Sequence, residues 1–78
     1  MNAPTTPKAF RAAAERLVRD AHPDATNLTV EWSFCSRRFV GADGVDGHFS
    51  GAVLVSADGY ATRRMIASYV PGAGMSVR

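Results

Sequence analysis

The first periodic stretch of the chain predicts an amphipathic helix over residues 7–21. Thr6 can cap the first free amides with its hydroxyl, and Pro7 suits the first helical position, where its missing N–H costs nothing. Pro23 ends the pattern, because a proline disfavours helical backbone in the residue before it. One face of this helix is apolar, with Phe10, Ala13, Ala14, Leu17, Val18 and Ala21. We therefore expect a helix that must cover another apolar surface.

The next stretch alternates apolar and polar residues, which predicts a half-buried strand over residues 28–35. The side chains expected to point inward are Leu28, Val30, Trp32 and Phe34. Cys35 is then expected on the outer face. The alternation fails over residues 37–40, where either the strand ends or a β-bulge resets the faces.

The register of the hairpin that follows depends on its loop. A two-residue turn at Asp58-Gly59 would pair Ala57 with Tyr60 and would mix apolar and charged groups on each face. A three-residue loop, with Gly59 in the left-handed position, would pair Ser56 with Tyr60. The second register separates apolar from polar side chains far better. We favour it, because a one-residue slip would invert every side chain.

This hairpin supplies two further strands, over residues 48–56 and 60–70. The predicted fold is α+β, with one N-terminal helix packed on a three-stranded antiparallel β-meander (αβββ). Residues 1–6 are expected to be a disordered lead-in, residues 7–70 a single domain and residues 71–78 a flexible tail. A domain this small buries only about 60% of the surface that its unfolded chain exposes. Dimerisation would bury further surface, so it is a second way to stabilise a fold of this size.

A single helix covers one face of such a sheet and leaves the other open. The expected open face carries an apolar cluster rimmed by arginine and tyrosine, residue types that are enriched at protein interfaces. The candidate partner-binding residues are Arg37, Leu54, Tyr60, Arg64 and Ile66. Scattered apolar residues are also common on ordinary protein surfaces, so this pattern alone does not identify an interface.

Composition removes several classes of protein. With 46% hydrophobic and 21% charged residues, the chain is neither a disordered polyelectrolyte nor a collagen-like repeat. The single cysteine excludes a disulfide within the chain. No stretch reaches the roughly 18 apolar residues of a membrane span, and the N-terminus has no signal-type apolar core. We therefore expect a cytoplasmic protein with no membrane partner.

The chain offers few groups for catalysis or metal binding. Cys35 and His48 form the one pair worth naming, since they could face the same way on neighbouring strands. Their spacing matches no zinc motif, and an open sheet would neither exclude water nor build an oxyanion hole. We expect no metal, no cofactor and no enzymatic activity.

The expected function is that of a small protein-binding module, which acts by occlusion or assembly on a foreign target or on a second copy of itself. Small stand-alone chains without a catalytic set are often regulators, or inhibitors supplied by phages and other mobile elements. The alternative is a small basic nucleic-acid-binding protein, in which Arg37 and Arg64 beside Tyr60 on the open face would form a stacking and phosphate-binding platform. The net charge of +2 does not by itself indicate such a partner. The doublets Arg37-Arg38 and Arg63-Arg64 weaken this alternative, because successive strand residues point to opposite faces.

Overall fold

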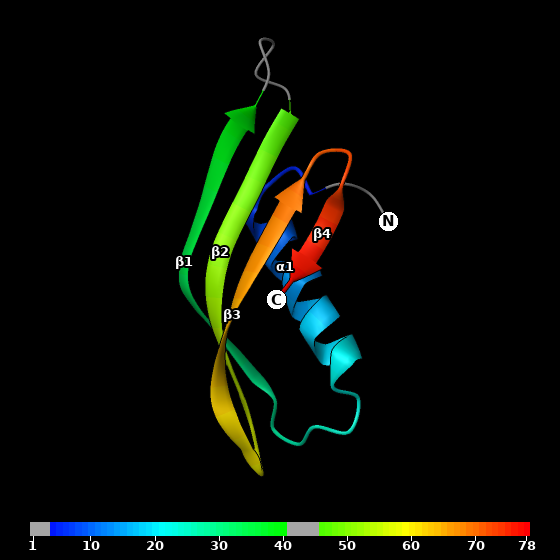
Figure 1. The fold of residues 1–78 in the computed structure, drawn as a ribbon, viewed down its shortest axis with the longest axis vertical. Coiled ribbons are helices and arrows are strands. Elements are labelled where there is room, and N and C mark those ends of the chain that lie inside the picture. Colours follow the sequence, from blue (N-terminus) through cyan, green and yellow to red (C-terminus); the bar gives the residue numbers. More distant parts are fainter. Residues whose placement is uncertain (1–3, 41–45) are drawn as a thin grey trace.

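The structure of this chain, a computed structural model, describes residues 4–40 and 46–78, with the side chains of residues 37–40 and 46 outside the description. It contains one helix and four strands (Figure 1). These elements are α1 (Pro7–Ala21), β1 (Thr29–Val40), β2 (Asp46–Ala57), β3 (Tyr60–Val70) and β4 (Gly74–Val77). The fold is therefore a small α+β fold with an antiparallel sheet, whose strand order is β1-β2-β3-β4.

Helix α1 spans the predicted residues, and its start is capped as the sequence indicates. The hydroxyl of Thr6 accepts a hydrogen bond from the backbone N–H of Ala9 at 3.1 Å, and Pro7 occupies the first turn. At the other end, the backbone N–H of His22 donates to the carbonyl of Arg19 at 3.1 Å. Both ends of the helix thus satisfy free backbone groups locally.

The prediction of three strands is wrong, because the segment 71–78 carries a fourth strand. The chain turns after Val70 through Gly72 and Gly74, whose φ angles of 85° and 88° favour glycine. The N–H of Ala73 donates to the carbonyl of Val70 at 2.9 Å and closes this turn. Four residues are too few to show a period of two clearly, so the sequence pattern gave no sign of this strand.

Strand β1 contains an irregularity that changes the expected faces. Trp32 pairs with Val53 and Phe34 with Ala52, so Ser33 is an extra residue between two ladder pairs. Phe34 therefore lies on the outer face, where it is 49% exposed, and Cys35 turns inward and packs against the core. The expectation of an inward Phe34 and an outward Cys35 is wrong for this reason.

The β2–β3 hairpin has the two-residue turn that we did not favour, yet most of its side chains lie on the predicted faces of the sheet. Ala57 pairs with Tyr60 across a two-residue turn, so the predicted three-residue loop is wrong. A register shift follows, after which Val55 pairs with Arg63. This shift returns the rest of the hairpin to the predicted sorting of faces, but it leaves Tyr60 on the opposite side from the one expected.

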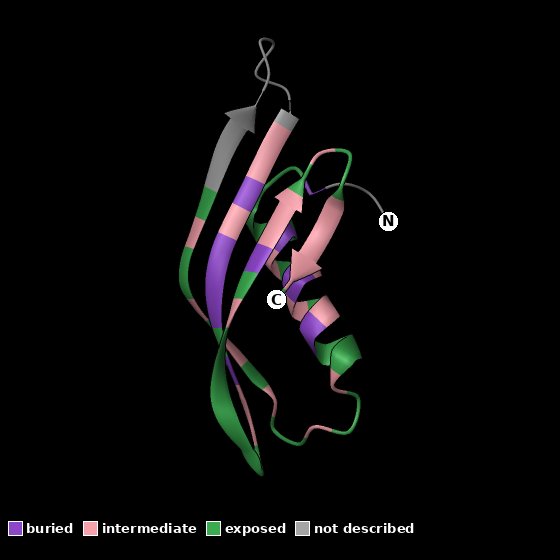
Figure 2. Ribbon diagram, in the orientation of Figure 1, coloured by how far each residue is buried: buried purple, intermediate pink, exposed green. Residues whose placement is uncertain are grey.

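Helix α1 packs against one face of the sheet and contacts β1, β3 and β4. Phe10, Ala14, Phe49 and Ala67 form one buried cluster, and Val18, Val53 and Val55 form another. Beyond the helix, the β2–β3 hairpin projects with residues 60–64 all exposed (Figure 2). The chain measures 47 × 23 × 18 Å and exposes 5253 Å². Compact monomers of this mass expose about 4,600 Å².

Candidate functional site

The sheet face that points away from α1 is called the open face below. Because strands β1, β2 and β3 are in register, its side chains form rows that run across the strands. The first row consists of Glu31 on β1, Leu54 on β2 and Arg64 on β3. All three are exposed, and Leu54 remains 38% exposed. This row therefore has an acidic end, an apolar centre and a basic end.

The next row is apolar and lies directly beside the first. Phe34 and Ile66 flank Ala52, and they are 49% and 45% exposed. Ala52 itself is fully buried although α1 packs on the opposite face, because it lies between these two larger side chains. Arg78 extends the row, since its backbone exchanges hydrogen bonds with Ile66 at 2.7 and 2.9 Å. The open face thus presents a compact apolar patch beside a basic side chain.

A third row is made entirely of serines: Ser36, Ser50, Ser68 and Ser76. The hydroxyls of Ser36 and Ser50 are 3.1 Å apart, and those of Ser68 and Ser76 are 3.0 Å apart. These hydroxyls hydrogen-bond in pairs along the sheet. The apolar patch is therefore bordered on this side by a polar row that carries no charge.

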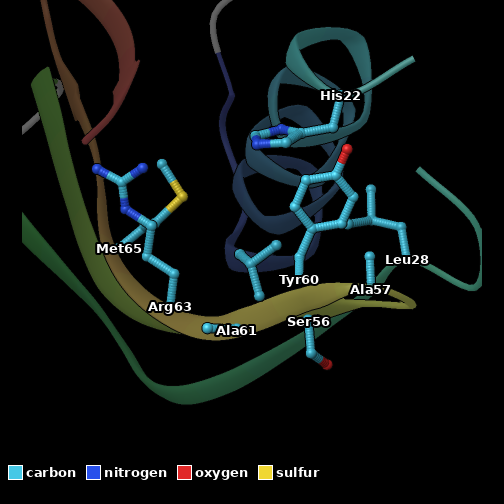
Figure 3. A pocket seen from close by; sticks show the side chains of 9 residues that line it. His22, Leu28, Ser56, Ala57, Tyr60, Ala61, Arg63 and Met65 are labelled. Atoms are coloured by element: carbon cyan, nitrogen blue, oxygen red, sulfur yellow. The ribbon is translucent and has the colours of Figure 1, made fainter. Parts of the chain in front are cut away.

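The structure brings together three of the five candidate partner-binding residues. Leu54, Arg64 and Ile66 are neighbours on the open face. Tyr60 lies on the α1 side, where its ring points toward His22 (Figure 3). The backbone of Arg37 pairs with Phe49, and its side chain is outside the described residues.

Sequence reasoning did not place Phe34 and Arg78 on the open face. Phe34 was assigned to the core, because the run from Trp32 to Cys35 alternates without a break and hides the bulge. Glu31 is predicted on the outer face of its strand, and the register adds that it lies opposite Leu54, as the acidic end of a row. Arg78 was placed in a tail. The loss of alternation after residue 36 indicates that side chains change faces in this strand, but it does not locate the bulge between Trp32 and Phe34.

Cys35 and His48 do not form the pair that the sequence allowed. Cys35 pairs with Gly51 and packs against the core beneath α1. His48 is three residues from Gly51 along a regular part of β2, so it lies on the other face. The bulge in β1 is again the cause, because it moves Cys35 from one face to the other.

Within residues 4–40 and 46–78, no three His, Cys, Asp or Glu side chains gather as metal ligands would. The helix in this part of the chain is too short and too polar to cross a membrane. No family model, no curated protein and no solved structure matches this chain.

Proposed function

We propose that this chain is a small protein-binding module that assembles through its open face, and that the partner on this face is a second copy of the chain. The observation that carries the proposal is the order of groups across the first row, from Glu31 through Leu54 to Arg64. If a second copy is rotated by half a turn and placed on this face, the acidic end of its row lies over the basic end of the first copy's row. Closed two-fold contacts of this kind are the commonest in protein oligomers.

The two-fold arrangement can be followed strand by strand. If the rotation axis runs along β2, then β1 of one copy lies over β3 of the other. Glu31 then faces Arg64 of the second copy, and Phe34 faces Ile66 of the second copy. Leu54 and Ala52 lie near the axis and face their own equivalents. Two packed sheets have closely aligned strands and a separation of about 10 Å, which suits these side chains.

Burial favours the same arrangement. Phe34, Leu54 and Ile66 are the exposed large apolar side chains of the first two rows, and all three would be removed from water in the dimer. Each square ångström of apolar surface removed from water contributes about 25 cal/mol.

The nucleic-acid alternative finds less support on this face. A base-stacking platform needs aromatic rings beside the basic groups. The exposed ring on the open face, Phe34, is on β1, with β2 between it and Arg64 on β3, and Tyr60 lies on the other side of the sheet. The centre of the face is aliphatic at Leu54 and Ile66, and the carboxylate of Glu31 opposes phosphate. These features favour a protein partner over a nucleic acid.

Replacing Leu54 or Ile66 with aspartate is expected to dissociate the dimer. Each variant would place two unpaired carboxylates in the contact, one from each copy, and burying such a charge without a partner is costly. We expect the dissociation constant to rise at least about a hundredfold. Sedimentation equilibrium across a range of protein concentrations measures this change.

Tyr60→Asp is the matched control, because it also replaces an exposed apolar residue but lies on the α1 side of the sheet. Its dissociation constant should equal that of the wild type. Circular dichroism should show that all three variants remain folded. A wild-type chain that stays monomeric up to about 100 μM contradicts the proposed partner, because such a contact would be weaker than a specific one.

A further inference from the structure

A cavity of about 130 Å³ lies on the α1 side of the sheet, away from the open face. Its walls come from the end of α1, from the connection to β1, and from β2 and β3 (Figure 3). The described residues that line it all lie between His22 and Met65 in the sequence, and none belongs to β4. The cavity therefore depends on the helix end and on the β2–β3 hairpin.

The walls of this cavity are mainly apolar. Val55 is buried among the lining residues, and Leu28 and Met65 are half-buried on opposite sides of the cavity (Figure 3). An apolar cavity of about 150 Å³ in another protein holds one benzene ring. The space beside Val55 therefore suits an apolar group about as large as a single six-membered ring.

Two of the lining side chains favour an aromatic ring over an aliphatic chain. Met65 offers a thioether sulfur, which makes favourable contacts with the edges of aromatic rings. Tyr60 lies across the cavity from Met65 and offers a ring, and aromatic rings pair well in offset or edge-to-face arrangements (Figure 3). An aromatic group between these two side chains would contact both of them.

The imidazole of His22 forms a fixed wall of the cavity. Its Nδ1–H donates to the carbonyl of Val18 at 3.1 Å, which holds the ring at the end of the helix. The hydroxyl end of Tyr60 points toward this imidazole (Figure 3). The cavity thus has polar groups at the helix end and apolar groups over the sheet.

The charge beside the cavity is positive. Arg63 is exposed and lies next to Met65, across from Leu28 and Tyr60 (Figure 3). Among the described residues that line the cavity, none carries a carboxylate. An arginine can bind a carboxylate through two parallel hydrogen bonds, which are stronger than those between neutral groups. The surroundings of Arg63 therefore suit a ligand with one negative charge.

We propose that this cavity binds a small aromatic carboxylate. The ring of the ligand lies between Tyr60 and Met65, and its carboxylate stays at the exposed side, where it pairs with Arg63. A carboxylate fits better than a phosphate group, because a phosphate carries up to two negative charges and would meet a single arginine here. This site does not depend on the proposed dimer, because it lies on the other side of the sheet.

The probe is phenylacetate, and its binding is followed through the backbone amide signals of the isotope-labelled chain in NMR spectra. We expect saturable shifts around Leu28, Arg63 and Met65, with a dissociation constant of about 1 mM or lower, as suits a ligand of this size. Phenylethanol keeps the ring but has no charge, and it should bind at least about tenfold more weakly. Acetate keeps the carboxylate without the ring, and it should give no saturable shifts at the same concentrations.

Arg63→Gln should weaken phenylacetate binding at least about tenfold and leave phenylethanol binding unchanged. Arg64→Gln is the matched control, because it makes the same change on the open face, and its affinity should equal that of the wild type. Leu54→Asp should also bind phenylacetate normally, so that loss of the dimer and loss of this site can be told apart.

Three results would overturn the proposal. The first is that phenylacetate gives no saturable shifts, or that they gather around Phe34 and Ala52 on the open face. The second is that phenylethanol or acetate binds as tightly as phenylacetate. The third is that Arg63→Gln binds phenylacetate as tightly as the wild type does.

Discussion

Replacing Phe10 with alanine is expected to destabilise the domain by about 3–5 kcal/mol. Phe10 is fully buried at the centre of the first core cluster. Its ring stacks on Phe49 with 5.2 Å between ring centroids and meets Trp32 at 5.7 Å. Domains of this length have a total stability on the order of 4–12 kcal/mol, so the loss would unfold a large fraction of the molecules.

Urea unfolding followed by the fluorescence of Trp32 measures this effect, since Trp32 is the single tryptophan and borders both core clusters. Tyr60→Ala is the control: it also removes an aromatic ring, but from a side chain that is 63% exposed. Its free energy of unfolding should change by less than about 1 kcal/mol. Equal losses in the two variants would mean that α1 does not cover the sheet in the way described.

Replacing Gly51 with alanine is expected to produce the second large loss of stability, of about 1–3 kcal/mol. A Cβ atom at Gly51 would lie 2.6 Å from Cζ3 of Trp32 and 2.7 Å from the backbone carbonyl oxygen of Phe34. The first contact can relax only if the indole moves, and the second only if strand β1 moves. This position therefore needs glycine for space.

The contact with the indole can be tested separately with a double-variant cycle. In a Trp32→Leu background, the first of the two close contacts is removed and the contact with the Phe34 carbonyl remains. Gly51→Ala should then cost less than it does beside tryptophan, with a coupling of about 0.5–3 kcal/mol. Additive losses, or a Gly51→Ala variant as stable as the wild type, would contradict the close packing of Trp32 on β2.

The parts of the fold that were predictable are those fixed by local chemistry. Thr6, Pro7 and Pro23 define the ends of α1, because capping and proline sterics act within a few residues. The faces of the β2–β3 hairpin followed from separating apolar and polar side chains. This criterion fixes which face a residue occupies but not which residue it pairs with, so it missed a turn followed by a register shift.

The remaining features depend on contacts that are distant in sequence. An uninterrupted alternation from Trp32 to Cys35 concealed the bulge, which is visible only from the pairing with β2. Strand β4 packs Met75 and Val77 against the core, and a four-residue segment shows no such role by itself. Leu54, Arg64 and Ile66 could be predicted as neighbours on the open face from the sequence, whereas the places of Phe34 and Arg78 there, and the position of Glu31 opposite Leu54, required the register.

The most direct test of the central claim, that the open face pairs with a second copy, is an exchange of charges between two variants. In Glu31→Arg, two arginines would face each other at both ends of the contact, and in Arg64→Glu two glutamates would do so. Each variant alone should dimerise at least about tenfold more weakly than the wild type.

Analytical ultracentrifugation of an equimolar mixture then gives the decisive result. In the mixed pair, every arginine faces a glutamate, so we expect heterodimers with nearly wild-type affinity. The double variant Glu31→Arg/Arg64→Glu should likewise recover the homodimer. A mixture that stays monomeric, or single variants that dimerise as tightly as the wild type, would contradict the two-fold pairing of the open face.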